Sequence, residues 1–412
     1  MNTLIANIGL LAGVRKENKI LRGTALAELP SVQNAFVIVE DGIIVETGEM
    51  SKLSPSRLGI QNSFDASGKF VLPCWCDSHT HIVFAASREE EFIDKIKGTS
   101  YAEIAARGGG ILNSAKRLNE MSGDRLFDLA WTRLKEVQQL GTGAVEIKSG
   151  YGLSVEGELK MLRVIKKLKE KSNIAVRSTF LGAHAYPQEY QGNHNGYIDC
   201  IICEMLPVIA NEKLADYVDV FCENGFFSVE ETETICKAAM KYGLKPKLHV
   251  NQLNSIGGIE AGIKLNAVSL DHLETMSEHD IEILSASGTI ATLLPTAAFF
   301  LRASFPPARK LIDAGGAVAL ASDYNPGSSP SGNMNLVLAM SCIQMKMLPE
   351  ETINAATLNG AFAMGVENEV GSIAIGKKAN FIITKPIPSL AYLPYAFGSN
   401  LIDKVMIGGA FI

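Results

Sequence analysis

The chain has 412 residues, of which 47% are hydrophobic and 20% are charged, so it is long enough to bury a large core. Its net charge of -6 at pH 7 gives no general attraction to nucleic acid or to an anionic membrane, so we expect a small-molecule partner and neither of those two. The seven cysteines are odd in number and scattered, which argues against a disulfide framework and indicates a reducing cytoplasm.

Residues 1–68 have the pattern of strands and hairpins. Ala35–Thr47 holds two β-rich runs joined by Asp41-Gly42, the dipeptide most typical of a two-residue hairpin turn. From about residue 70 the pattern changes, and β-rich runs alternate with helical segments. The amino-terminal region is therefore predicted to fold separately from the alternating region that follows it.

The first run of the alternating region is Val71–Val83 (VLPCWCDSHTHIV), which we predict to be one buried parallel strand. His79 and His81 near its carboxyl end point to the same side, because positions i and i+2 of a strand share a face. Two converging imidazoles suit a divalent metal, although a lone His-x-His also occurs as two ordinary hydrogen-bonded histidines. Cys74 and Cys76 are predicted to be packing residues, since free cysteine is often buried.

Seven further β-rich runs alternate with helical segments, which predicts a (β/α)8 TIM barrel of the α/β class. A doubly wound open sheet is the alternative. The seven runs are Ala144–Lys148, Ala175–Leu181, Tyr217–Phe221, Lys247–Val250, Ala267–Leu270, Ile290–Leu294 and Ala317–Ala321. The predicted helices are Tyr101–Ala106, Ile111–Leu118, Arg125–Leu140, Glu156–Lys169, Glu230–Tyr242 and Ser277–Ser285.

The carboxyl-terminal region returns to short strands, predicted at Gly371–Ile375, Asn380–Thr384 and Lys404–Ile407. Because β segments bracket the barrel, we expect the two ends of the chain to combine into one small domain. The predicted division is residues 1–68 with 360–412 for the composite β domain and 69–359 for the barrel.

Polar residues gather where the predicted barrel strands end, which is where active sites of this fold lie. Five of the seven histidines occupy such positions: His79, His81, His184, His249 and His272. His194 and His279 do not, and we expect them on the surface. Lys148, Tyr151, Gln252, Asp271 and Asp323 also follow strand ends. This convergence favours a metal site over chance clustering.

These motifs resemble the amidohydrolase superfamily: Asp-Ser-His-Thr-His after the first strand, a histidine at the fifth, Asp-His at the sixth and Ser-Asp at the eighth. Val370–Ile383 is similar to the stretch that closes the composite β-sandwich of those enzymes. Within the superfamily, the chain is similar nearly end to end to the enzymes that open an imidazolone ring. The stretches that carry this similarity are Asp77–Phe84, Tyr101–Ile111, Val145–Leu153, Phe180–His184 and Ser322–Ser328.

The resemblance implies hydrolysis of 4-imidazolone-5-propanoate to N-formimidoyl-L-glutamate at one Zn or Fe ion per chain, in a protein that we expect to be a homodimer. The implied metal ligands are His79, His81, His249 and Asp323. The implied substrate contacts are Arg88, Tyr151, His184, Gln252, Asn325, Gly327 and Ser328. His272 would stabilise the developing oxyanion, and Asp323 would carry the proton from water to the leaving nitrogen.

Several simpler interpretations stay open. Arg88 could be a solvated charge beside three glutamates, Tyr151 a turn residue between two glycines, and Asn325-Pro326-Gly327 simply a turn. A related deaminase, or a relative that binds without catalysis, would share the barrel. Deaminases of this type need a carboxylic acid where this chain has Gln252, and no implied ligand is missing, so the ring-opening hydrolase is favoured.

Lys148 is the remaining residue that bears on the number of metal ions. Relatives with two metals bridge them with a carboxylated lysine, but Lys148 lies on the second predicted strand and precedes the Ser-Gly-Tyr-Gly segment. We therefore expect a mononuclear site and expect Lys148 to pair with a carboxylate, for which Glu146 is a weak candidate on the same face of the strand.

Overall fold

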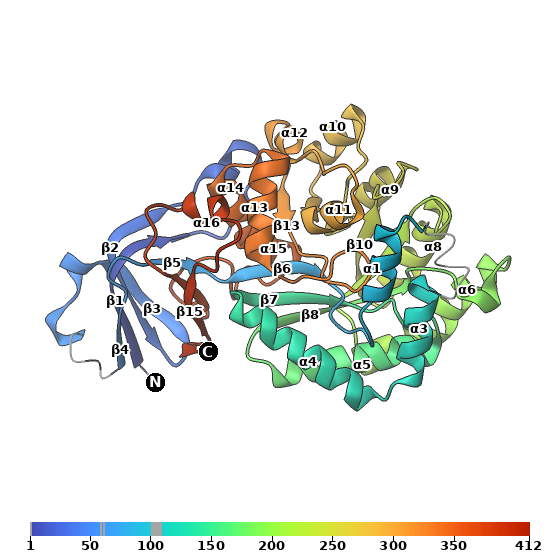
Figure 1. The fold of residues 1–412 in the computed structure, drawn as a ribbon, viewed down its shortest axis with the longest axis horizontal. Coiled ribbons are helices and arrows are strands. Elements are labelled where there is room, and N and C mark those ends of the chain that lie inside the picture. The colour runs from blue at the N-terminus through green and yellow to red at the C-terminus, as the bar shows by residue number, and fades with distance from the viewer. Residues whose placement is uncertain (1, 58–59, 61, 100–108) are drawn as a thin grey trace.

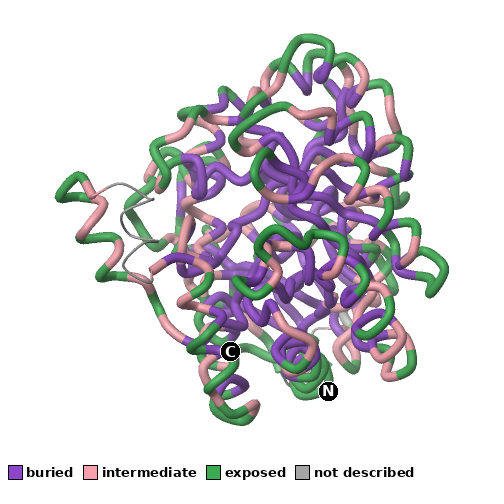
Figure 2. Tube along the Cα trace, turned by 90° about the vertical axis from the view of Figure 1, so that its right-hand side faces the viewer, coloured by how far each residue is buried: buried purple, intermediate pink, exposed green. Residues whose placement is uncertain are grey.

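The computed structural model describes residues 2–57, 60, 62–99 and 109–412. Its strands form two separate sheets of eight strands each. In Figure 1 the sheet built from both ends of the chain lies on the left, and the parallel sheet with its helices lies on the right. In Figure 2 the buried trace is concentrated in the middle of the molecule, and exposed segments surround it.

The parallel sheet has its strands in chain order, each paired with the next along the sequence, as a (β/α)8 barrel requires. All eight predicted barrel strands have a counterpart, so the predicted fold is confirmed. The strands are β6 (Trp75–Thr80), β7 (Thr142–Lys148), β8 (Ala175–Ala183), β9 (Tyr217–Cys222), β10 (Lys245–Val250), β11 (Ser269–His272), β12 (Ile290–Leu293) and β13 (Val318–Leu320).

The barrel closes between its last and first strands just beyond their ends. The backbone N–H of Asp323 donates to the carbonyl of His79 at 3.0 Å, and that of His81 donates to the carbonyl of Tyr324 at 2.9 Å. A parallel bridge between Thr80 and Tyr324 belongs to the same seam. Asp323, three residues past β13, is thereby fixed against His79 and His81 at the end of β6.

Helices lie between most of the barrel strands (Figure 1). The helices from α1 to α9 are α1 (Glu89–Ile96), α3 (Gly110–Glu120), α4 (Gly123–Gln139), α5 (Val155–Lys171), α6 (His194–Cys200), α7 (Leu206–Glu212), α8 (Val229–Met240) and α9 (Gly258–Lys264). The others are α10 (Glu278–Ala286), α11 (Pro295–Leu301), α12 (Ala308–Asp313), α13 (Met334–Met345), α14 (Pro349–Ala356), α15 (Leu358–Ala363) and α16 (Tyr392–Tyr395). None of the described helices is both long and apolar enough to cross a bilayer.

Five of the six predicted helices correspond to α3, α4, α5, α8 and α10. The sixth, Tyr101–Ala106, lies outside the described residues, as does most of the Tyr101–Ile111 stretch. Local capping explains several starts: Ser122 accepts a hydrogen bond from Arg125 N–H at the start of α4, and Ser228 forms a capping box with Glu231 at the start of α8.

The second sheet joins the two ends of the chain, as predicted, and residues from both ends, such as Ile5 and Met406, belong to one apolar cluster. β1 pairs in parallel with β4 and β5, and the other pairs of the sheet are antiparallel. The strands are β1 (Asn2–Ala12), β2 (Ser31–Glu40), β3 (Ile43–Glu49), β4 (Asn62–Asp65), β5 (Phe70–Pro73), β14 (Phe381–Thr384), β15 (Ile402–Ile407) and β16 (Ala410–Phe411). That the two sheets are the cores of two domains, divided at residues 69 and 359, is a proposal.

Two predicted strands differ from the structure. Val71–Val83 is not one strand, because Phe70–Pro73 is β5 of the terminal sheet and Trp75–Thr80 is β6 of the barrel. The backbone changes partner at Cys74, whose N–H donates to Asn380, whereas the next N–H donates to Gly141. Both halves of the run are buried, so hydropathy gives no sign of the switch. The predicted strand Gly371–Ile375 is also wrong, since only Ile373 forms an isolated bridge there.

Other local predictions are confirmed. Asp41 and Gly42 have φ values of 48° and 82°, which is the geometry of a type I′ turn between β2 and β3. Cys74 and Cys76 are buried and free, as expected of packing residues. His194 and His279 are both exposed.

The barrel interior contains an unusual number of charged groups for a region that branched apolar side chains normally fill. Glu146, Lys148, Asp219, Lys247 and Asp271 are each 0% exposed. Glu146 accepts from Lys148 at 2.7 Å and also pairs closely with Lys247. Each of these charges therefore depends on its partners rather than on water.

We expect Lys247→Met to lower the free energy of unfolding by about 3–5 kcal/mol, because the Glu146 carboxylate would lose one of its two ammonium partners inside the barrel. Chemical denaturation followed by circular dichroism measures this loss. The matched control is Lys264→Met, which removes a lysine 67% exposed that pairs with Glu233 at 2.8 Å. Its loss should stay below about 1 kcal/mol, and equal losses for the two variants would contradict the prediction.

Candidate metal centre

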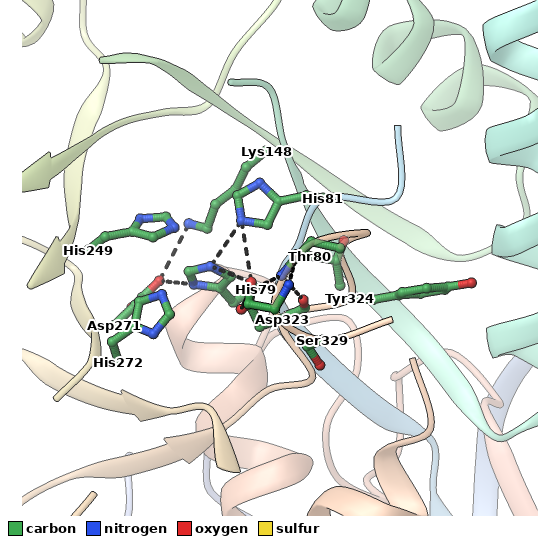
Figure 3. A network of polar contacts seen from close by, with 12 residues as sticks. His79, Thr80, His81, Lys148, His249, Asp271, His272, Asp323, Tyr324 and Ser329 are labelled. Carbon is green, nitrogen blue, oxygen red and sulfur yellow. Dashed lines mark hydrogen bonds and ion pairs between the residues drawn. The ribbon is translucent and has the colours of Figure 1, made fainter. Parts of the chain in front are cut away.

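Four side chains converge at the carboxyl ends of the barrel strands, and Figure 3 shows them together. One ligand atom from each of His79, His81 and His249 lies within 4.8 Å of the other two. The Nε2 atoms of His79 and His81 are 3.3 Å apart, and each is 3.4 Å from Oδ1 of Asp323. Three imidazoles and one carboxylate are a donor set that suits zinc or iron.

The protonation of these histidines fits metal binding. Burial lowers the pKa of His79, His81 and His249 well below the ordinary value, so the three rings are neutral at pH 7. His249 Nε2 is buried and has no hydrogen-bond partner among the described residues. A buried ring nitrogen without a partner is costly unless something binds there, and a metal ion would fill that role.

Two aspartates contact two of the three histidines. Nδ1 of His79 donates to Asp271 Oδ2 at 2.6 Å, which leaves its Nε2 lone pair free for a metal. Asp219 holds His249 through the backbone, because its Oδ1 accepts the His249 N–H at 3.1 Å. Its Oδ2 lies 3.0 Å from His249 Nδ1, although this ring nitrogen makes no hydrogen bond among the described residues. Lys148 lies between these two aspartates, as Figure 3 shows on the Asp271 side.

His272 also contacts a carboxylate through Nδ1, and its backbone is strained. Its φ is 86° and that of Leu273 is 68°, a region that L-residues rarely adopt. Its Nδ1 lies 3.3 Å from Glu274 Oε1. Although burial opposes the cationic form, the adjacent Glu274 carboxylate holds the pKa of His272 above its ordinary value. An imidazolium beside the metal site can donate a hydrogen bond to an oxygen that becomes negative.

Asp323 differs from an ordinary surface aspartate. Burial raises its pKa to about 7, and the neighbouring His272 and hydrogen bonds from the following loop partly oppose that rise. The Ser328 hydroxyl lies 3.2 Å from Asp323 Oδ2. Asn325 organises the loop, because its Oδ1 accepts the N–H groups of Gly327 and Ser328 at 2.8 Å each. A carboxyl with a pKa near neutrality is suited to accept and then release a proton.

A cavity of about 50 Å³ adjoins three of the four donors, His81, His249 and Asp323. It is lined by His81, Tyr151, His184, Phe221, His249, Gln252, His272, Asp323, Asn325 and Ser328. His184 donates from Nδ1 to the carbonyl of Gly150 at 2.9 Å, and burial lowers its pKa to about 4, so the ring is neutral. The Gln252 amide makes no hydrogen bond to another described residue. The volume is that of one or two water molecules.

Arg88 and Gly327 lie beside this cavity rather than among its lining residues. The Arg88 guanidinium lies 5.8 Å from the Tyr151 ring centroid, and its Nε donates to Ser114 at 2.9 Å. Its Nη2 is buried and unpartnered within the described part of the chain. A Cβ at position 327 would come 2.6 Å from Arg88 Nη1, so glycine leaves room for the guanidinium.

The structure thus brings the sequence-predicted residues into one region. Lys148 pairs with carboxylates, as predicted. The residues that sequence reasoning assigned no role are Asp219, Asp271, Glu274 and Lys247. For Asp219, Lys247 and Asp271, the sequence did offer one signal: a charged residue inside an apolar parallel strand is rare unless that charge is paired.

Comparison with known proteins identifies the family to which the chain belongs. Residues 222–412 match the Amidohydrolase family. The imidazolonepropionase of Flavobacterium johnsoniae is 59% identical over 413 residues, and that of Christiangramia forsetii is 53% identical, each with 100% of both chains covered. The imidazolonepropionase of Parabacteroides distasonis is 43% identical over 95% of this chain and 94% of its own.

Similar solved structures are more distant in sequence. E. coli guanine deaminase has a TM-score of 0.74 at 13% identity, covering 100% of this chain and 99% of its own. An adenosine deaminase from Xanthomonas campestris with bound zinc has a TM-score of 0.70 at 16% identity, covering 99% and 92%. At this identity they show the fold alone. Because identity to the first group is high along the whole sequence, the chain belongs to the imidazolonepropionase family of amidohydrolases.

Proposed function

We propose that this protein hydrolyses the cyclic amide bond of 4-imidazolone-5-propanoate and releases N-formimidoyl-L-glutamate, a step of histidine degradation. The observation that carries the proposal is the 59% identity, over the full length of both chains, to an imidazolonepropionase. The cluster of three histidines and Asp323 beside a polar cavity supports it. The protein is thus a metal-dependent hydrolase that acts on a small molecule.

For the cofactor, we propose one Zn or Fe ion per chain, held by His79, His81, His249 and Asp323. When bound there, such an ion lowers the pKa of water toward about 7 and polarises a carbonyl oxygen. Lys148 forms ion pairs with Glu146 at 2.7 Å and with Asp219 at 2.8 Å. Because this lysine is therefore not free to be carboxylated, these contacts support a single ion. We also propose that the protein is a cytoplasmic homodimer.

In the proposed reaction, Asp323 accepts a proton from the attacking water as a bond forms between the water oxygen and the ring carbonyl carbon. His272 donates a hydrogen bond to the carbonyl oxygen as it becomes negative. Asp323 then passes the proton to the ring nitrogen as the carbon–nitrogen bond breaks.

The proposed substrate contacts hold the ring and its propionate chain. The unpartnered Nη2 of Arg88 suits the propionate carboxylate. Tyr151, His184 and Gln252 line the cavity and can hydrogen-bond the ring. Asn325, Gly327 and Ser328 are proposed to contact the substrate through the loop that they form, since the polar atoms of the Asn325 side chain already bond within that loop.

We expect Arg88→Ala to raise KM for 4-imidazolone-5-propanoate about tenfold or more, since a charged hydrogen bond is worth roughly 1.5–3 kcal/mol. Metal content, measured by elemental analysis, should stay normal. Arg117→Ala is the control, because Arg117 shares a surface pocket with Arg88 but is exposed. An unchanged KM in the Arg88 variant would contradict the proposed substrate contact and indicate that Arg88 is only a surface charge.

Gln252 separates ring opening from deamination, because an amide cannot donate a proton to the ring at any accessible pH. Gln252→Ala should cost about 1–3 kcal/mol of transition-state stabilisation.

The Gln252→Glu variant should keep some ring-opening activity and gain no deaminase activity, whereas the Asp323→Asn variant should lose all turnover. Parallel assays of substrate loss and ammonia release test this. Faster ammonia release from an aminated purine or pyrimidine by the unmodified protein would refute the proposed function.

Removal of the metal should abolish activity and leave the fold in place. Dialysis against a chelator, followed by titration with Zn²⁺ or Fe²⁺, should restore full activity at about one ion per chain, because four donors converge on one point. Elemental analysis of the active protein provides the count. A value near two ions per chain would contradict the mononuclear site.

A further inference from the structure

Lys148 occupies a central position behind the candidate metal centre. It is the last residue of β7 and its side chain is 0% exposed. Its Nζ lies 2.8 Å from Asp219 Oδ2, 3.4 Å from Asp271 Oδ2 and 2.7 Å from Glu146 Oε1. One ammonium group therefore contacts a carboxylate of its own strand, β7, and one carboxylate each from β9 and β11.

Two of those carboxylates also contact histidines of the site. Asp271 accepts from His79 Nδ1 at 2.6 Å, and Asp219 lies 3.0 Å from His249 Nδ1. Two like charges held this close in an apolar interior repel each other unless a cation lies between them. Lys148 is the cation that the two aspartates share, since its Nζ lies 2.8 Å from an oxygen of Asp219 and 3.4 Å from one of Asp271.

We propose that Lys148 is a positioning residue of the metal centre, whose ammonium group clamps Asp219 and Asp271 and thereby fixes His249 and His79 for binding one ion. The inference rests on the metal site of the proposed function. It assigns Lys148 no contact with the substrate or with the ion. The carboxylates that hold ligand histidines typically govern metal affinity by roughly 10–100-fold, and Lys148 serves two of them.

If Lys148 acted through its charge alone, its removal would change the metal affinity in the opposite direction. The five buried groups comprise three carboxylates and two ammonium groups: Glu146, Asp219 and Asp271 with Lys148 and Lys247. Removing either lysine makes the centre more negative, which strengthens the attraction for a cation. Positioning therefore predicts weaker metal binding in a lysine variant, and a purely electrostatic role predicts tighter binding.

The test compares Lys148→Met with Lys247→Met in the full-length protein. Lys247 is equally buried, but it pairs with Glu146 and with the Ser78 carbonyl rather than clamping the two aspartates. We expect Lys148→Met to weaken Zn²⁺ binding roughly 10–100-fold, measured by competition with a chelator without substrate. Lys247→Met should bind Zn²⁺ with equal or higher affinity, although its stability falls.

The visible spectrum of the Co²⁺-loaded protein provides a second readout, because it reports ligand geometry. It should change in Lys148→Met and stay as in the unmodified protein in Lys247→Met. If Lys148→Met does not fold, the double variant Lys148→Met with Glu146→Gln restores the charge balance and leaves both orienting aspartates in place. Its Zn²⁺ affinity should still be at least tenfold lower.

Equal or tighter Zn²⁺ binding by Lys148→Met, or by the double variant, would overturn the inference. That result leaves the proposed function intact, provided the unmodified protein binds one ion and opens the imidazolone ring. If instead the unmodified protein binds no Zn²⁺, Fe²⁺ or Co²⁺, the proposed metal site itself fails. The two failures are therefore distinguished by measurements on the unmodified protein.

Discussion

The seam that closes the barrel also builds the site. The hydrogen bonds from Asp323 to His79 and from His81 to Tyr324 join the end of the last strand to the first. A slip of one residue at this seam would turn the side chains of one strand to the opposite face. Three of the four proposed ligands are carried by the two segments that meet here. Their convergence is therefore fixed by the register of the whole parallel sheet.

Much of this arrangement follows from sequence because strand periodicity and barrel geometry are simple rules. His79 and His81 share a face since they are two residues apart, and the carboxyl ends of parallel strands share one rim. Those two rules suffice to bring His249, His272 and Asp323 to the same place. The roles of Arg88 and Gln252 were suggested by family resemblance, because nothing in local spacing distinguishes a substrate contact from a turn or a surface charge.

The other features could not be predicted, because they depend on which strands and side chains pair in the folded protein, and the sequence alone does not show this. The switch of sheets at Cys74 is hidden because both neighbouring strands are equally apolar. The contacts of Lys148 with Asp219 and Asp271 join strands that are far apart in sequence. Sequence marks each of these residues as a charge in an apolar strand, but the side chain that it meets is set by the register across several strands.

The terminal sheet has a consequence for the order in which the protein can be completed. β5 pairs with β1 on one side and with β14 on the other, and the chain builds the entire barrel between β5 and β14. During synthesis, β5 therefore presents an open edge until Phe381–Thr384 leaves the ribosome. An unpaired strand edge is a template for aggregation. A nascent chain stalled within the barrel would leave this edge of β5 without the strand that covers it in the folded protein.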